Sequence, residues 1–206
     1  MKVADSVEHA IDDWEDCKAE SAMLHACNAI DGTAAKAYPR LGTKTRFTRL
    51  LRDNYSIFGP MGLPGIDIEK TRFPVTVKGP TTDDGRPDIA DVIYGVHRCT
   101  HAHGDELPAG FDLIPDAAGS EGISRVQVSK GRLRLSDRVI FGLLGVAIMS
   151  PANVGQRTPD AYYLTFGTSA VLTINDWWGR AADFAAIAAL EPVPSVKLDF
   201  GDWMDP

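Results

Sequence analysis

Hydrophobic residues recur every three or four positions over residues 1–38, and acidic residues lie mostly off this stripe. The stripe consists of Val7, Ile11, Trp14, Cys17, Leu24 and Asn28 or Ala29. This spacing predicts a long helical stretch that Gly32 breaks or kinks and Pro39 closes. A second helix is predicted over 43–55, with its arginines facing outward. Residues 59–65 contain too many glycines and prolines for a regular element.

The middle of the chain predicts a strand and two helices. Alternating hydrophobic residues over 72–78 indicate a short strand. A third helix is expected to start near Pro87, because proline suits the first helical position, and to end at Gly104. Its buried stripe is Ile89, Val92, Ile93, Val96 and Thr100. A fourth helix over 137–149, capped by Ser136, is hydrophobic nearly all round and should therefore be central.

Two hairpins and a last helix complete the predicted elements. Alternating residues on either side of a short turn place the hairpins near 123–135 and 161–174. Asn175 is expected to cap a last helix over 176–190. We find no internal repeat and no long linker, so the prediction is a single α+β domain over 1–206. It is predominantly α: a helical bundle with two small β-hairpin insertions.

Composition narrows the class of protein. The 206 residues include 44% hydrophobic and 24% charged residues, the balance of a globular protein. No hydrophobic run reaches the roughly 18 residues that cross a bilayer, and the early Asp5 argues against a signal peptide. Cys17, Cys27 and Cys99 lack metal-finger spacing, so they are expected to be reduced thiols in the cytoplasm.

Charge is distributed unevenly along the chain. The net charge of −7 argues against a general nucleic-acid binder, yet residues 32–52 contain six basic and no acidic residues. Such polarity can steer an anionic ligand to one face, although a solvated helix face explains it equally well. Lys44, Arg46 and Arg49 are expected to border the same groove as Arg98, as RNA-binding residues.

Three of the five histidines lie close together at the end of the third helix. A histidine can transfer a proton at a ribose hydroxyl, and Arg98 can hold the scissile phosphate of RNA. On an ideal helix Arg98 and His103 point about 140° apart. They converge only if the helix ends before His103 or if a second subunit completes the site. His101 shares a face with Arg98 more easily and is a competing candidate.

The same residues allow two other interpretations. His97 and His101, four residues apart, match two zinc ligands on one helical face, to which Asp105 or Glu106 could add oxygen. Alternatively, the histidines only complete a helix C-terminus, where backbone carbonyls and the helix dipole attract a proton. We favour the metal-free site, and no metal or cofactor is expected.

One short pattern resembles a known family. Its residues are Tyr94, Arg98, His103, Gly104 and Asp105, which resemble the signature of HEPN (higher eukaryote and prokaryote nucleotide-binding) domains. The resemblance implies a helical bundle, dimerisation that brings two arginine–histidine pairs into one cleft, and metal-independent ribonuclease activity in toxin–antitoxin or phage-defence systems. Arg98 then becomes the phosphate clamp and His103 the catalytic acid or base, with Tyr94 in support.

Two features keep an alternative open. Cys99 stands where active members of that family often have a polar residue, so a non-catalytic module that binds a nucleotide, RNA or a partner protein is the alternative. Asp31 could pair with Arg98 and orient it, although a turn before Gly32 explains Asp31 more simply. The expected partners are RNA or a nucleotide, a second copy of the chain, and an antitoxin or defence-system protein, with no DNA and no membrane.

Overall fold

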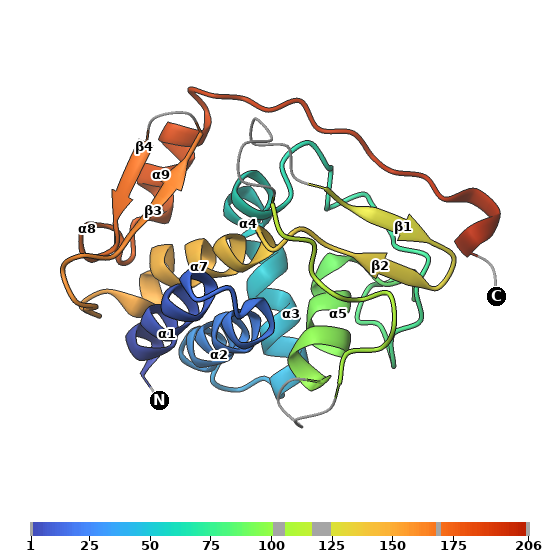
Figure 1. The fold of residues 1–206 in the computed structure, drawn as a ribbon, viewed down its shortest axis with the longest axis horizontal. Helices are drawn as coiled ribbons and strands as arrows, with labels where there is room; N and C mark the ends of the chain where they lie inside the picture. The colour runs from blue at the N-terminus through green and yellow to red at the C-terminus, as the bar shows by residue number, and fades with distance from the viewer. Residues whose placement is uncertain (1, 101–105, 117–124, 168–169, 205–206) are drawn as a thin grey trace.

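The computed structural model of the chain describes residues 2–100, 106–116, 125–167 and 170–204. These residues form an α+β fold that is mainly α, as predicted, with helices packed around one buried hydrophobic cluster. Figure 1 shows one small hairpin at each end of the helical bundle. No helix in this part of the chain is long and hydrophobic enough to cross a membrane.

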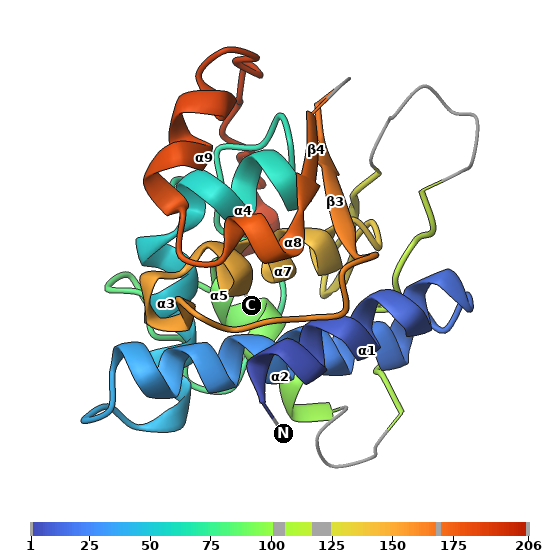
Figure 2. The ribbon, with the colours of Figure 1, turned by 90° about the vertical axis from the view of Figure 1, so that its left-hand side faces the viewer.

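The first 38 residues form two helices rather than one stretch. Helix α1 spans Val3–Glu15 and helix α2 spans Ala19–Ala37, and the two pack closely against each other (Figure 2). The break is at Cys17, whose φ of 60° lies in the left-handed region and reverses the chain. The prediction of a break or kink at Gly32 is wrong, because α2 continues through it. A methyl group at Gly32 would lie 3.0 Å from the Val3 side chain, so α1 approaches α2 closely there.

Helices α3 and α4 follow each other directly. Helix α3 spans Thr43–Asp53, close to the predicted 43–55, and α4 spans Tyr55–Gly62, which includes part of the 59–65 stretch where the sequence predicted no regular element. The glycines that argued against a helix are instead contact points. A Cβ atom at Gly142 would lie 2.9 Å from the Gly62 Cα, so only glycine lets α4 pack so closely on α7.

Helix α7 spans Val139–Met149 and is the central helix of the bundle, as predicted. It packs against α4 and α2, and nearly all of its residues are buried. The Ser136 hydroxyl accepts the backbone N–H of Arg138 at 3.0 Å, so Ser136 caps the turn that leads into the helix.

The third helix is not a uniform α-helix. Helix α5 spans Ile89–Val92, and its N-cap is Asp88, whose carboxylate accepts the Asp91 backbone N–H at 3.0 Å. The chain then continues as a π-helix, η1, over Ile93–Arg98. The predicted stripe from Ile89 to Val96 is buried. The sequence therefore predicts the buried face of this helix but not its change of winding.

Both predicted hairpins are present. Strand β1 (Gln127–Ser129) pairs with β2 (Arg132–Arg134), and β3 (Tyr163–Phe166) pairs with β4 (Ala170–Thr173), both antiparallel. Gly131, with φ 75°, turns the first hairpin between Ser129 and Arg132. In the second, Leu164 opposite Leu172 faces the protein interior.

Two predicted elements differ from the structure. Residues 72–78 form no strand: Phe73, Val75 and Val77 are buried against the core, but no neighbouring strand pairs with them among the described residues. The last helix is split into α8 (Ile174–Trp177) and α9 (Ala181–Ala188), because Gly179 adopts φ 84° between them. Two short 3-10 turns, η2 (Pro151–Asn153) and η3 (Gly201–Met204), complete the elements.

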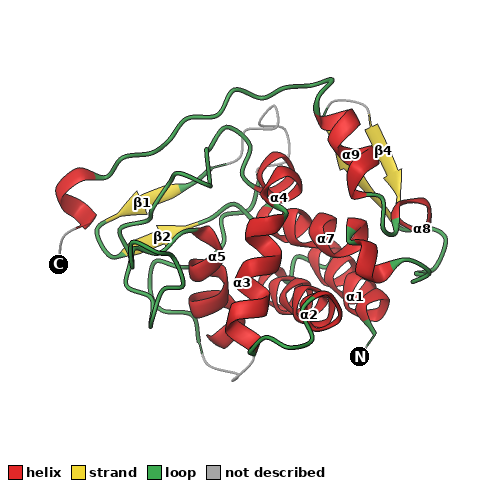
Figure 3. Ribbon diagram, turned by 180° about the vertical axis from the view of Figure 1, so that it is seen from behind, coloured by secondary structure: helices red, strands yellow, loops and turns green. Residues whose placement is uncertain are grey.

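The C-terminal segment crosses the molecule. From α9 it runs along one side to the β1–β2 end, which Figures 1 and 3 show from opposite directions. The backbone of Val196 pairs with Ile66, and the rings of Phe200 and Trp203 stack next to Phe73. The segment thus packs over Phe73, a fully buried core residue.

Candidate functional site

The π-helix places Arg98 opposite helix α2. The Arg98 Nε donates to the Asp31 Oδ2 at 2.9 Å, so the pair considered from the sequence is present. The simpler interpretation of Asp31 as a turn residue is wrong, because α2 continues to Ala37. Burial lowers the pKa of Arg98, but the hydrogen bond and the charge of Asp31 outweigh it and raise the pKa overall. Arg98 therefore carries a permanent charge in a fixed orientation.

Tyr94 forms the floor of this site. The Arg98 guanidinium lies 5.4 Å from the centre of the Tyr94 ring, and the Lys44 ammonium lies 5.9 Å from it. Phe47 packs its ring edge-on against Tyr94, with the centroids 5.3 Å apart. Burial raises the pKa of Tyr94, so its phenol is neutral at physiological pH. The ring thus holds two cations through its electron-rich face.

The π-helical winding coincides with the site. Such segments are rare and often occur at functional sites, because they change where side chains point. Tyr94 and Arg98 both lie within η1. Gly95 lies between them, and a Cβ atom there would collide with Val77 Cγ1. The contact with Val77 explains why glycine is needed at this position, and it seats η1 against the buried segment 72–78.

Two buried polar atoms at the site have no hydrogen-bond partner among the residues that the structure describes. They are the Asp31 Oδ1, an acceptor, and the Arg46 Nε, a donor. Both residues act electrostatically on Tyr94, so both lie near it. Buried polar groups are almost always paired, and an unpaired one often marks a place where a ligand or water binds. The site therefore has one donor and one acceptor that a ligand could engage.

Most of the basic residues in 32–52 are already engaged. Lys36 donates to Asn153, Arg49 pairs with Asp53, and Arg52 pairs with Asp88 and Asp91. The Lys44 ammonium donates to the backbone carbonyls of Lys78 and Gly79. Within the described chain, Arg40 and Arg46 are the two members of the set whose side chains make no hydrogen bond or ion pair. The ion pairs offset the charges of Arg49 and Arg52, so the positive field is smaller than the sequence suggests.

The predicted RNA-binding trio is thus only partly together. Lys44 and Arg46 lie beside Tyr94, as expected. Arg49 does not: its guanidinium stacks 4.9 Å from the ring of Tyr38 and pairs with Asp53 at 3.3 Å. The reason is local, since Tyr38 and Asp53 offer Arg49 partners that the sequence pattern does not reveal.

The histidine candidates are placed unevenly. His101 and His103 lie outside the described residues. His97 is fully buried inside the π-helix, which makes it part of the core rather than an open ligand. No group of three or more metal-binding side chains occurs among the residues that the structure describes. Cys27, one helical turn before Asp31, is fully buried, and burial raises the pKa of its thiol well above the ordinary value.

The sequence analysis missed a second arginine–aspartate centre. Arg52, expected to face solvent, donates to Asp88 at 2.7 Å and to Asp91 at 2.9 Å, and Thr81 and Tyr55 complete the network. One signal was available: Asp88 and Asp91 flank the buried stripe of the third helix, where a solvated carboxylate is out of place.

Comparison with known proteins gives a family without a stated activity. A family model named Rv1289 matches residues 2–204. The chain is 43% identical over 202 residues to proteins of Mycobacterium tuberculosis H37Rv and Mycobacterium bovis. Each alignment covers 98% of this chain and 95% of the relative. Both relatives are described as uncharacterized proteins. No solved structure is significantly similar to the chain.

Proposed function

The chain belongs to the Rv1289 family, and we propose that it is an HEPN-like, RNA-binding protein with metal-independent endoribonuclease activity. The observation that carries the proposal is the Arg98 guanidinium, held by Asp31 on one edge and seated on Tyr94. Only its Nε is bonded, and its two terminal nitrogens have no partner in the described part of the chain. They form the planar fork that matches two phosphate oxygens.

The surrounding charges suit an RNA backbone. Lys44 lies over the Tyr94 ring and Arg46 acts electrostatically on Tyr94, so both add positive charge near the Arg98 site for a neighbouring phosphate. The unpaired Asp31 Oδ1 is an acceptor, and a ribose 2′-hydroxyl is a donor that RNA has and DNA lacks. This combination of a cationic fork and an isolated acceptor favours RNA over DNA.

The chemistry needs no metal. The 2′-oxygen attacks the phosphorus, the P–O5′ bond breaks, and a 2′,3′-cyclic phosphate and a 5′-hydroxyl form. One histidine removes the 2′ proton and another donates a proton to the departing 5′-oxygen. His103, with His101 as the competing candidate, takes this role by the HEPN resemblance. Arg98 stabilises the charge that develops on the phosphate. A homodimer would supply the second histidine from the partner copy.

The alternative is a module that binds RNA or a nucleotide without cleaving it. The engagement of Arg98 by Asp31 favours this reading, because a fixed, half-buried arginine can bind an anion without taking part in a reaction. Both readings use the same phosphate site and differ in the histidines. A toxin–antitoxin or phage-defence setting, with a protein partner, follows from the HEPN resemblance.

The decisive assay is incubation of the purified protein with RNA in EDTA. We expect cleavage near neutral pH with 2′,3′-cyclic phosphate ends, and its loss in Arg98→Ala and in His103→Ala. Arg180 provides a matched control: its Nε donates to Asp183 at 2.6 Å, and its guanidinium lies 4.9 Å from the Trp177 ring. Arg180→Ala should leave cleavage intact.

Other outcomes separate the alternatives. If EDTA abolishes cleavage while His103→Ala retains it, the metal-free mechanism is wrong. If the parent binds RNA but leaves it intact, the non-catalytic module replaces the enzyme. Light scattering that shows a strict monomer at micromolar concentration contradicts a site shared between two copies.

A further inference from the structure

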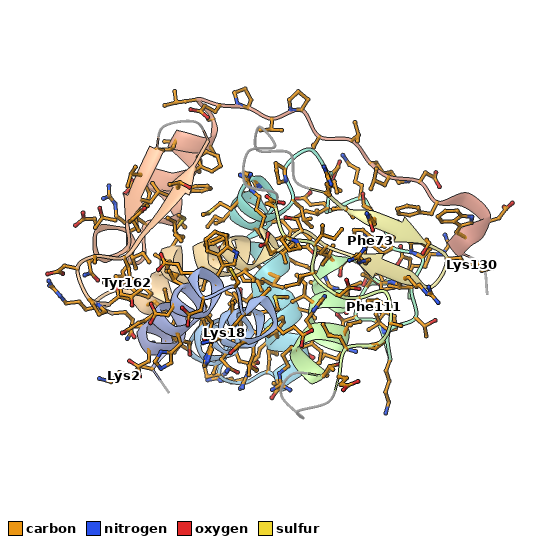
Figure 4. The ribbon with its side chains drawn as sticks, viewed as in Figure 1. Lys2, Lys18, Phe73, Phe111, Lys130 and Tyr162 are labelled. Carbon is orange, nitrogen blue, oxygen red and sulfur yellow. The ribbon has the colours of Figure 1, made fainter. Side chains whose placement is uncertain are left out.

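A large cavity lies between helix α1, helix α7 and strand β3. Its volume is about 590 Å³, within the range of small-molecule sites. Figure 4 labels Tyr162 where the β3–β4 hairpin meets α1. The cavity shares no residue with the Arg98 site. Its hydrophobic walls come from several elements: Ile11, Trp14, Met61, Phe141, Tyr162 and Leu164.

One cation lines this cavity, and it is only partly used. The Arg138 Nε donates to the backbone carbonyl of Met61 at 2.8 Å, which fixes the plane of the guanidinium. Its two terminal nitrogens have no hydrogen bond or ion pair with any described residue, and they are not among the buried unpaired atoms, so solvent reaches them. The end of the guanidinium is therefore a free two-pronged donor at a hydrophobic cavity.

The carboxylates nearby do not neutralise Arg138. Asp12 accepts the Tyr162 hydroxyl at 2.6 Å. This hydrogen bond, together with burial, raises the pKa of Tyr162 to about 12, so the phenol stays protonated and keeps donating to Asp12 at neutral pH. Asp137 accepts the Trp14 indole N–H at 3.1 Å and a backbone N–H at 3.0 Å. Glu15 is exposed and lines the cavity without a side-chain partner among the described residues.

We propose that this cavity binds a small monocarboxylic acid with an aromatic or other hydrophobic body. The carboxylate would take both terminal nitrogens of Arg138, a bidentate match. The body would lie against Trp14 and Phe141, whose rings pack edge to face with centroids 4.8 Å apart. Asp12 and Glu15 repel a second negative charge, so a monoanion fits better than a phosphate dianion.

The proposal is tested by titration with 3-phenylpropionate, the neutral 3-phenylpropanamide and phenyl phosphate. Trp14 lines the cavity and reports binding by its fluorescence, and Trp14→Phe assigns the signal; calorimetry gives an independent affinity. We expect the carboxylate to bind at least about tenfold more tightly than the amide, because only the carboxylate can pair with the guanidinium fork. Phenyl phosphate should be the weaker of the two anions.

Two substitutions should act in opposite directions. Arg138→Gln should weaken carboxylate binding about tenfold or more and leave amide binding unchanged. Glu15→Gln removes a repelling charge at an exposed position and should tighten carboxylate binding about twofold. Equal affinity for the carboxylate and the amide, tighter binding of phenyl phosphate, no binding at millimolar concentration, or weaker binding in Glu15→Gln would each overturn the proposal. Failure of the RNA assay would leave this site untouched.

Discussion

The molecule contains two arginine–aspartate centres with similar residues. They differ in how many of their hydrogen-bonding groups have partners. Arg52 uses all three kinds of guanidinium nitrogen: it donates to Asp88, Asp91 and the Thr81 hydroxyl. Among the described residues, Arg98 makes a single side-chain hydrogen bond, to Asp31, whose second carboxylate oxygen is buried and receives no donor from them. Both arginines come from helices that pack on the same core. The two centres therefore differ in the number of hydrogen bonds that their arginines make and not in residue type.

The difference indicates two roles. The Arg52 centre joins α3 to the start of α5, and its carboxylates are almost completely buried. Each carboxylate oxygen and each guanidinium nitrogen in it has a hydrogen-bond partner, so we assign its contribution to stability. The Arg98 centre lies where the π-helix faces α2, and it keeps donors and an acceptor that no described residue engages. Unused hydrogen-bonding capacity at a fixed charge is what a binding site requires.

The largest expected effect is on stability, at the saturated centre. Arg52→Ala leaves Asp88 and Asp91, 4% and 0% exposed, without their cation. We expect a loss of about 3–5 kcal/mol in the free energy of unfolding, because uncompensated buried charges are costly. Urea denaturation measures it. A loss under about 1 kcal/mol would show that water or rearrangement replaces Arg52, and the contrast between the two centres would fail.

Acid should reveal the same centre. Burial raises the pKa of Asp88, but hydrogen bonds from Arg52, the Asp91 backbone and Tyr55 outweigh it and lower the pKa overall. A carboxylate with a depressed folded-state pKa stabilises the protein above its unfolded pKa of about 4, and this stability is lost as pH falls through the folded-state value. The fall in stability on acidification should therefore shrink in Asp88→Asn. An unchanged pH profile would contradict this assignment, and Asp160→Asn, at an exposed ion pair, serves as the control.

A smaller stability effect is expected at the unsaturated centre. Arg98→Ala removes one hydrogen bond, and its partner Asp31 is still 18% exposed. The expected loss is about 1–2 kcal/mol, the cost of one unpaired polar group rather than a dismantled network. Thermal or urea unfolding compares it with Arg52→Ala. If the two variants lose equal stability, Arg98 is a structural residue and the binding role loses its support.

The sequence predicts the Arg98 centre better than the Arg52 centre. The signature around Arg98 is local, so its residues were found, and the Asp31 pair was recognised as possible. The Arg52 network joins residues 36 and 39 positions apart, and periodicity alone assigned Arg52 to the solvent side. The unpaired atoms of Asp31 and Arg46 result from the packing of α2, α3 and η1 against one another. The sequence of one segment alone does not predict this packing.

The fold shows the same division. Hydrophobic periodicity predicted α3, α7 and both hairpins, because in these elements the buried face follows directly from the spacing. It failed for α4, where Gly62 is needed for contact with α7 rather than for a turn. It also failed at Cys17 and at Gly179, where single residues with positive φ redirect the chain. Winding of the π-helix is set by tertiary packing, including the contact of Gly95 with Val77.

The smallest expected effect concerns Arg46. Its Nε is buried near Tyr94 with no partner in the described chain, and Arg46 is proposed to contact a neighbouring phosphate. Arg46→Gln should weaken RNA binding uniformly across sequences and reduce the slope of log affinity against log salt by about 0.7, the value for one contact to a single strand. Anisotropy titrations at several salt concentrations measure the slope. An Arg49→Gln control should leave it unchanged, since Arg49 is engaged by Asp53 and Tyr38.

The most direct test of the unsaturated centre is binding without cleavage. A labelled RNA keeps the 2′-hydroxyl that Asp31 is proposed to accept, and a His103→Ala background removes cleavage. Anisotropy then reports affinity alone for this parent background and for Arg98→Gln and Arg180→Gln within it. The account predicts a loss of at least about tenfold in Arg98→Gln, the worth of a charge-assisted phosphate contact, and no change in Arg180→Gln. Equal affinities for all three proteins would contradict the assignment of Arg98 as the phosphate-binding residue.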